Sequence, residues 1–219
     1  MFRKMFERNQ GTYTEEEQNK LAESCVTIVG VGGIGSWMPE ILSRSGVGKF
    51  ILIDGDKYEV SNKNRQIGAL NSTIGLNKVE VMARRLIDIN EEIVVKPLVE
   101  FIDETVDLDK IKETDVFVSL TDKFGMRTSV ARIAEKLNKP ICMGGQYGMV
   151  FYTGFFTDHK EFYKYNIDNP DTANMTSLHL PTNIVWGAVQ CKNILDWLMG
   201  REVHRINQFT TWNLFGEKM

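Results

Sequence analysis

Four glycines follow one short apolar run, and an acidic residue follows a second apolar run. Residues 26–29 are apolar or β-branched and lead into Gly30, Gly32, Gly33 and Gly35. Residues 50–53 are apolar and end at Asp54. Glycines allow backbone N–H groups to approach a phosphate at a helix N-terminus, and a carboxylate after the second strand is placed to bind a ribose hydroxyl. The pattern predicts a strand, a tight turn, a helix and a strand that together bind a nucleotide.

The polar residues after this unit indicate which nucleotide. Arginine offers a fork of donors to phosphate oxygens, lysine a point charge and asparagine a neutral hydrogen-bond partner. A carboxylate at the end of a third apolar run would supply the hard oxygen ligand that Mg²⁺ prefers. The phosphate-binding roles are predicted for Arg65, Lys78 and Asn62, with Gln66 nearby, and the role of metal ligand for Asp122. Asp56 either helps to position the metal cation or caps the following turn.

A dinucleotide dehydrogenase is the simplest alternative, because the glycine spacing also matches that fingerprint. A hydride-transfer site, however, needs a flat pocket for nicotinamide rather than a cluster of cations. Arg65 and Lys78 therefore favour a triphosphate over NAD. Arg127 lies one helical turn beyond Asp122, where either a phosphate contact or a surface ion pair is expected.

The elements that must position these residues alternate between helical and strand-like patterns. Thr14 and Glu17 are expected to form a capping box at the start of the first helix. Helices are predicted at 15–24, 36–44, 75–90, 124–137 and 181–199, and strands at 26–29, 50–53, 93–99, 116–120, 140–143, 150–156 and 208–214. We expect an α/β fold, a Rossmann-like doubly wound and mostly parallel sheet with helices on both faces.

The remaining segments complete one predicted domain over residues 1–219. Residues 1–25 form an N-terminal arm and helix, and residues 181–219 form a C-terminal helix and strand. The segment 144–148 is interpreted as a turn, and residues 158–180 as a long surface crossover loop. The first eight residues either pack on the domain or remain solvated, or they form an arm that reaches a nucleotide site, in which case Arg8 is the basic residue of interest.

Composition narrows the class of protein. The net charge of −3 gives no bulk electrostatic reason to expect nucleic-acid binding. No apolar stretch approaches the ~20 residues of a membrane span, and three widely spaced cysteines argue against a disulfide framework or a cysteine-based zinc site. We therefore expect a cytoplasmic protein without a membrane partner. Core positions are expected for Cys25, Cys142 and Cys191, core or dimer-interface positions for Trp186, Trp197 and Phe209, and no metal site for His159, His179 and His204.

Several motifs in register resemble the ubiquitin-activating-enzyme-like superfamily, which includes the sulfur-carrier adenylyltransferases. They read G-V-G-G-I-G-S, I-D-G-D, S-N-K-N-R-Q, G-L-N-K and S-L-T-D, within a region of similarity over residues 8–157. The resemblance implies ATP-dependent adenylylation of a carboxylate, commonly the C-terminus of a ubiquitin-fold carrier protein or a peptide, on a homodimer. It also implies that Asp54 holds the ribose, that Asn62, Arg65 and Lys78 hold the phosphates, that Asp122 holds Mg²⁺, and that Arg8 reaches the partner subunit's ATP.

Two further interpretations remain open. The segments G-V-G-G-I-G-S-W, N-R-Q-I and G-L-N-K-V-E-V-M-A-R-R resemble the tRNA threonylcarbamoyladenosine dehydratases, so tRNA is retained as an alternative substrate although the charge gives nucleic acid little support. Residues 162–165 stand where many relatives have a zinc-binding C-x-x-C, and residues 174–176 stand where a relay cysteine often lies. We therefore expect no zinc and an activity that stops at the acyl-adenylate. A non-catalytic relative that binds a peptide or carrier tail is the third alternative.

Overall fold

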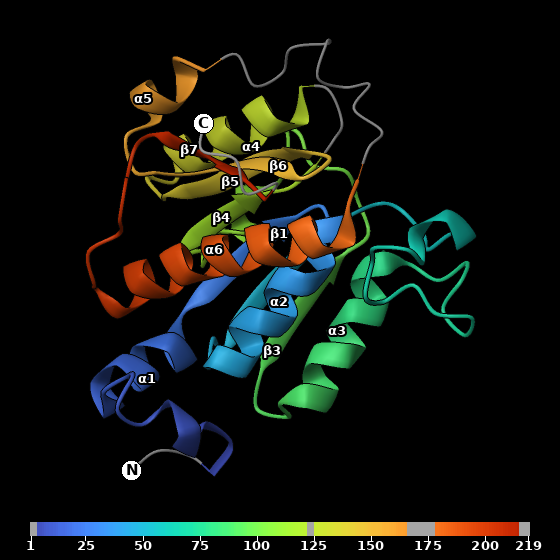
Figure 1. Ribbon diagram of the computed structural model, residues 1–219, viewed down its shortest axis with the longest axis horizontal. Coiled ribbons are helices and arrows are strands. Elements are labelled where there is room, and N and C mark those ends of the chain that lie inside the picture. Colours follow the sequence, from blue (N-terminus) through green and yellow to red (C-terminus); the bar gives the residue numbers. More distant parts are fainter. Residues whose placement is uncertain (1–3, 122–124, 166–177, 215–219) are drawn as a thin grey trace.

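A seven-stranded sheet forms the centre of the protein (Figure 1). The computed structural model describes residues 4–121, 125–165 and 178–214. The sheet order is β3-β2-β1-β4-β5-β6-β7, in which the first five strands are parallel and β6 and β7 are added antiparallel. The strands are β1 (Cys25–Val29), β2 (Lys49–Ile53), β3 (Val94–Leu98), β4 (Val116–Ser119), β5 (Ile141–Tyr147), β6 (Val150–Phe156) and β7 (Phe209–Asn213).

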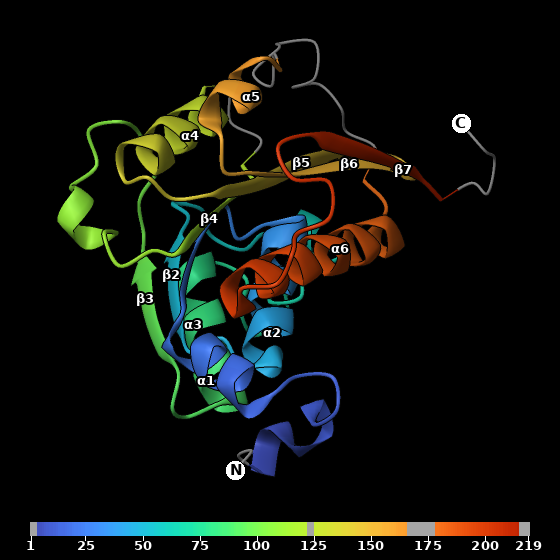
Figure 2. The ribbon, with the colours of Figure 1, turned by 90° about the vertical axis from the view of Figure 1, so that its left-hand side faces the viewer.

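Helices cover both faces of this sheet, as predicted. Four helices share one face and its hydrophobic cluster, and two others lie on the opposite face (Figures 1 and 2). The first group is α1 (Glu15–Glu23), α2 (Gly33–Ser45), α3 (Lys78–Ile89) and α6 (Leu180–Met199), and the second is α4 (Met126–Lys136) and α5 (His159–Tyr163). Three 3₁₀ turns, η1 (Lys4–Asn9), η2 (Val60–Asn62) and η3 (Leu108–Lys110), complete the described elements. None of the helices in these residues is long and apolar enough to cross a membrane.

The apolar runs become strands because both of their faces are covered. Side chains alternate across a strand, so Phe50 and Leu52 of β2 enter the cluster under α2, α3 and α6. Ile51 and Ile53 enter the cluster under α4 and α5. β1 is buried over its whole length and divides in the same way. A continuous apolar run is the expected pattern for such a doubly covered parallel strand.

The chain changes direction across the sheet between β1 and β4. From β1 it continues through β2 to β3, and then returns to β4 on the opposite side of β1. The turns that follow β1 and β4 therefore meet at the carboxyl edge of the sheet. An added Cβ on Gly30, which has a φ of +91°, would lie 3.0 Å from the carbonyl carbon of Leu120. Ligands of doubly wound sheets bind at this kind of reversal.

The capping box predicted at the start of α1 is confirmed. Thr14 accepts the N–H of Glu17, whose carboxylate in turn accepts the N–H of Thr14, so the capping box is present. α6 ends at Gly200 in the left-handed conformation. Pro97 lies in β3, an edge strand, where a missing donor is tolerated.

Two predictions are wrong in detail. The segment 144–148 was predicted as a turn, but β5 continues to Tyr147 and pairs with β6. The glycines serve close packing there, since a Cβ on Gly144 would lie 2.8 Å from the indole nitrogen of Trp186. The predicted loop 158–180 begins with α5, which Asp158 caps and buried Phe162 anchors. The part of that loop at residues 166–177 lies outside the described residues.

An ion pair connects α1 to the segment that follows α6. Arg201, just after α6, donates to both carboxylate oxygens of Glu17 in α1 at 2.6 and 2.8 Å, and to the carbonyl oxygen of Thr12 at 2.7 Å. These bonds, together with the capping-box bond from Thr14, lower the pKa of Glu17 to about 2. The charged form of Glu17 is therefore stabilised by folding.

We expect this ion pair to give the stability a specific pH dependence. Because the folded pKa lies below the unfolded value of ~4.3, the contribution is full above that value and is lost as pH falls toward 2. Glu17→Gln should lower the melting temperature near pH 7, and the difference from wild type should shrink between pH 5 and 2 in thermal scans. Glu16→Gln, which removes only an exposed pair with Lys20, should have little effect. A pH-independent difference for Glu17→Gln would contradict the assignment.

The glycine turn offers a second test of the fold. A Cβ on Gly35 would overlap the carbonyl oxygen of Gly30, whereas a Cβ on Gly32 would meet only the amide nitrogen of Gln66 at 3.6 Å. Gly35→Ala should reduce the free energy of unfolding by about 1–3 kcal/mol despite alanine's higher helix propensity. Gly32→Ala should change it by less than ~0.5 kcal/mol. Urea unfolding measures both, and equal effects would show that the turn is less tightly packed than described.

Candidate functional site

A cavity of about 590 Å³ opens at the carboxyl edge of the parallel strands. This volume is typical of a site for a small molecule or cofactor. The sequence-predicted residues that line it are Gly30, Gly32, Gly33, Asp54, Asp56, Asn62, Arg65, Gln66 and Lys78. Gly35 packs beneath the glycine turn instead, and Asp122 lies outside the described residues. Arg8 is exposed in η1 and does not line this cavity within its own chain.

The glycine turn presents the N-terminus of α2 to the cavity. Gly32 is the N-cap residue, and α2 carries no acidic residue in its first turn. Unpaired N–H groups and the helix dipole at such a terminus favour an anion. The turn therefore fits a phosphate group by its backbone alone.

Asp54 holds this turn in place. One carboxylate oxygen accepts the N–H of Val31 at 2.7 Å and the other accepts the N–H of Asp56 at 2.8 Å. The residue is only 7% exposed. A carboxylate has about four lone-pair positions, so Asp54 can support the turn and still accept a hydroxyl of a sugar.

Lys78 is the most buried cation in the described lining of the cavity. It begins α3, is 6% exposed, and places its ammonium 3.2 Å from the carboxylate of Asp56. The backbone carbonyl of Asp56 also accepts the N–H of Lys78 at 3.1 Å. Asp56 therefore holds the Lys78 side chain and the start of α3 in place, a contact that the sequence did not predict.

The loop around η2 holds Arg65 beside the glycine turn. The guanidinium donates to the Ser61 carbonyl and to the Asn64 side chain, each at 3.0 Å, while the Arg65 carbonyl accepts the indole N–H of Trp37. Asn62 stabilises the same loop, because its side-chain oxygen accepts the N–H of Glu59 at 3.1 Å. The Arg65 side chain remains half-buried and passes 3.8 Å from the position of a Cβ on Gly33. It is therefore held close to where the turn would bind an anion.

A second wall of the cavity was largely missed from sequence. It comes from β5, β6, α4 and α6 and includes Arg127, Gln146, Tyr152, Asn183 and Trp186. Arg127 donates to the Thr121 carbonyl at 2.8 Å and to the Tyr152 hydroxyl at 3.3 Å, so it faces the cavity. Trp186 belongs to the core, one of the two positions predicted for it, and also lines the cavity. Asn183 is one of several polar residues in α6, so the sequence offered no local signal that singled it out.

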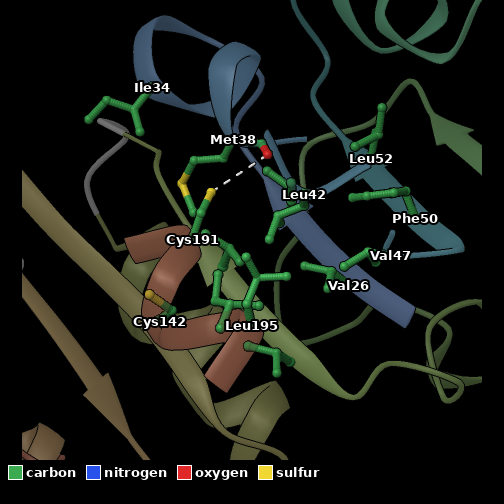
Figure 3. Packing of buried hydrophobic residues seen from close by; sticks show 14 of the residues in the cluster. Val26, Ile34, Met38, Leu42, Val47, Phe50, Leu52, Cys142, Cys191 and Leu195 are labelled. Atoms are coloured by element: carbon green, nitrogen blue, oxygen red, sulfur yellow. Dashed lines mark hydrogen bonds between the residues drawn. The ribbon is translucent and has the colours of Figure 1, made fainter. Parts of the chain in front are cut away.

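The cysteines do not supply a nucleophile among the described residues. All three are buried and unpaired. Burial raises the pKa of Cys25 to about 12, that of Cys191 well above its usual range, and that of Cys142 as well. Cys191 packs against α2, with its sulfur 3.7 Å from the Met38 carbonyl (Figure 3). The part of the chain that the structure describes also holds no group of three or more His, Cys, Asp or Glu placed to bind a metal.

Sequence comparison shows that this chain is similar to proteins of known function. The tRNA threonylcarbamoyladenosine dehydratase of Bacillus subtilis (strain 168) is 44% identical over 99 residues, which are 45% of this chain and 39% of that protein. The adenylyltransferase and sulfurtransferase MOCS3 of Arabidopsis thaliana is 33% identical over 138 residues, 63% of this chain and 30% of that protein. The aligned regions thus span less than half the length of these curated relatives.

Solved structures extend the similarity over nearly the whole chain. A crystal structure of Escherichia coli MccB with succinimide superimposes with a TM-score of 0.82 and 26% identity, covering 99% of this chain and 70% of that one. The structure of the same protein with ATP gives a TM-score of 0.78 and 26% identity, covering 97% and 72%. The sequence profile of the ThiF family matches residues 6–219. This chain therefore belongs to the ThiF family, within the ubiquitin-activating-enzyme-like superfamily that its motifs indicated.

Proposed function

We propose that this protein is an ATP-dependent adenylyltransferase that converts a carboxylate into an acyl-adenylate and releases pyrophosphate. The observation that carries the proposal is the meeting of Arg65 and Lys78 with the N-terminus of α2 in one cavity. Three sources of positive charge in one cavity fit a triphosphate. The crystal structure of MccB with ATP, a protein of the same fold at 26% identity, supports this choice of nucleotide.

The cavity residues suggest an order for the bound nucleotide along the sheet edge. Phe101 and Ile102, which follow β3, provide an apolar surface for the base. Asp54 at the end of β2 then binds the ribose, and the glycine turn of β1 with Arg65 and Lys78 binds the phosphates. The second wall, from β5 to α6, is left for the carboxylate substrate.

The chemistry follows from charge. The substrate carboxylate attacks the α-phosphorus, the bond to the bridging oxygen breaks, and pyrophosphate leaves. Two anions must approach each other, so Arg65 and Lys78 offset the phosphate charge and stabilise the charge that develops. The attacking carboxylate is already ionised at neutral pH, so no general base is required. Mg²⁺, which we propose Asp122 holds, would neutralise further phosphate charge when bound.

Two substrate classes remain candidates. We favour the C-terminus of a ubiquitin-like carrier protein, a sulfur carrier or a peptide, in line with the adenylyltransferase and sulfurtransferase MOCS3 and with MccB, which was also solved with MccA. The 44% identity to a tRNA threonylcarbamoyladenosine dehydratase favours a modified tRNA base as the second candidate. In both, the reacting group is a carboxylate. Residues 1–219 would form one adenylation domain, and exposed Arg8 would reach the partner subunit's ATP in a homodimer.

Loss of either cation should reduce catalysis without unfolding the protein. Arg65→Ala and Lys78→Ala should each slow carboxylate-dependent ATP–pyrophosphate exchange by about 10²-fold, which corresponds to ~3 kcal/mol of lost charge stabilisation. Lys63→Ala is the matched control, because Lys63 is an exposed cation of the same loop that does not line the cavity. Exchange should be assayed with a carrier or peptide C-terminus and, separately, with threonylcarbamoyl-modified tRNA. Wild-type rates in both cavity variants would overturn the assignment.

Ligand-dependent stability should identify the nucleotide. A ligand at 100 times its dissociation constant adds ~2.7 kcal/mol, which raises the melting temperature by about 5–11 °C for a chain of this length. We expect Mg²⁺-ATP to produce such a shift in wild-type protein and a much smaller one in Lys78→Ala. NAD should produce no comparable shift. A shift with NAD alone would instead support the dehydrogenase interpretation of the glycine pattern.

A further inference from the structure

Helices α2 and α6 run parallel and bring their N-termini to the same cavity. Asn183, near the start of α6, lies beside Gly33, the first residue of α2. Further along both helices, Gly187 lies beside the side chain of Met38, and Cys191 lies beside the Met38 carbonyl (Figure 3). Because the residue numbers rise together in the two helices, the positive ends of both helix dipoles lie at the same end, where Gly33 and Asn183 line the cavity.

Neither helix neutralises its own N-terminus. The N-cap residues are Gly32 for α2 and His179 for α6, and neither makes a side-chain cap hydrogen bond. Neither helix has an acidic residue in its first turn. Two positive helix ends that lie side by side repel each other, and an anion between them is stabilised by both. The pair of helices therefore favours an anion at this end more strongly than the glycine turn does alone.

The side chain of Asn183 supplies an independent observation at the same place. Asn183 is only 2% exposed, and its side-chain nitrogen has no hydrogen-bond partner among the described residues. That nitrogen lies 3.1 Å from the position of a Cβ on Gly33, and the Arg65 side chain passes 3.8 Å from the same point. The donor thus faces the positive end of α2 and lies near a cationic side chain. Because a buried donor without a partner is costly, a bound anion is the acceptor expected for it.

The place of Asn183 between the two walls determines which phosphate it meets. Asp54, the proposed ribose site, is hydrogen-bonded to the glycine turn through the N–H of Val31, so the phosphate next to the ribose lies at that turn. The carboxylate is proposed to approach from the second wall, and Asn183 belongs to that wall while lying against the turn. Lys78 begins α3, which packs on the other side of α2 from α6 (Figure 1). Asn183 is therefore next to the reacting α-phosphate.

On this basis, and resting on the proposed adenylylation, we propose that Asn183 is a catalytic residue that donates its side-chain N–H to a non-bridging oxygen of the α-phosphate. In the reaction a carboxylate oxygen forms a bond to the α-phosphorus, and the electron pair of the breaking bond leaves on pyrophosphate. The Asn183 donor stabilises the negative charge on the non-bridging oxygen and keeps its proton throughout. Because this donor is uncharged, it does not hold the incoming carboxylate away from the phosphorus in an ion pair.

Binding of adenosine, AMP and ATP tests this contact without the carboxylate substrate. Adenosine has no phosphate, AMP has only the α-phosphate, and ATP adds the β- and γ-phosphates. In calorimetric titrations of the wild-type protein, AMP should bind more tightly than adenosine. Asn183→Leu keeps the approximate volume of the side chain but removes the amide. It should weaken AMP binding about tenfold, the value of one hydrogen bond, and leave adenosine binding unchanged.

A charged variant and a matched control complete the test. Asn183→Asp keeps the size of the side chain but replaces the donor with a carboxylate that repels phosphate, so it should weaken AMP binding more than Asn183→Leu does. Asn193→Leu makes the same substitution at a half-buried position of α6 that does not line the cavity. This control should bind all three ligands as the wild-type protein does. Thermal unfolding of each variant checks that the fold is retained.

Other results would overturn the assignment. Unchanged AMP affinity in Asn183→Leu would show that Asn183 does not contact the α-phosphate, and a loss confined to ATP would assign the contact to the β- or γ-phosphate instead. Equal weakening of adenosine and AMP would indicate a structural role. If the wild-type protein bound neither AMP nor ATP, the proposed adenylyltransferase function would itself be wrong. That outcome differs from normal binding by the wild-type protein and unchanged binding by the variants, which would contradict only the role of Asn183.

Discussion

The site depends on the hydrogen bonds that the carboxylate of Asp54 accepts. It accepts the N–H of Val31 from the glycine turn and the N–H of Asp56 from the loop after β2. Asp56 then binds both the backbone and the ammonium of Lys78 at the start of α3. One buried acid thereby aligns three segments that are separate in sequence. Charge-assisted bonds to a carboxylate are stronger than neutral ones, which suits a residue that must maintain this arrangement before any ligand arrives.

Three cationic residues of the cavity are held by the protein's own contacts. Arg65 donates to Ser61 and Asn64, Arg127 to Thr121 and Tyr152, and Lys78 to Asp56. Side chains ordered in this way lose little conformational entropy on binding. A preorganised cluster of donors is also the arrangement that stabilises developing charge most effectively. The two walls thus differ in charge. Fixed charges lie near the glycine turn, and neutral donors and acceptors lie near α6.

The glycine turn, most elements and the cationic side of the cavity could be predicted from sequence because their signals are local. Buried parallel strands are continuous apolar runs, a capping box occupies four residues, and the glycines, Asp54, Asn62, Arg65 and Lys78 lie within 50 residues of one another. The second wall could not be predicted in this way. Gln146 lies in a segment interpreted as a turn, and Asn183 lies about 150 residues beyond the glycine turn that it approaches. The glycines at 144 and 145 were interpreted as part of a turn. In the structure they lack a Cβ where Trp186 and Tyr152 pack closely against the strand.

The sequence by itself determined the fold class, the nucleotide-binding turn and the cations that face it, because each is encoded by neighbouring residues whose conformation depends on local sterics and burial. Only the tertiary structure decided that Asp54 supports the turn, that Asp56 positions Lys78, and that α6 closes the cavity with Asn183 and Trp186. Those relations depend on the order of strands in the sheet, which brings the ends of β1, β2, β4 and β5 to one edge. Packing across that edge brings together residues that are far apart in the chain. Such contacts cannot be predicted from the periodicity of any single segment.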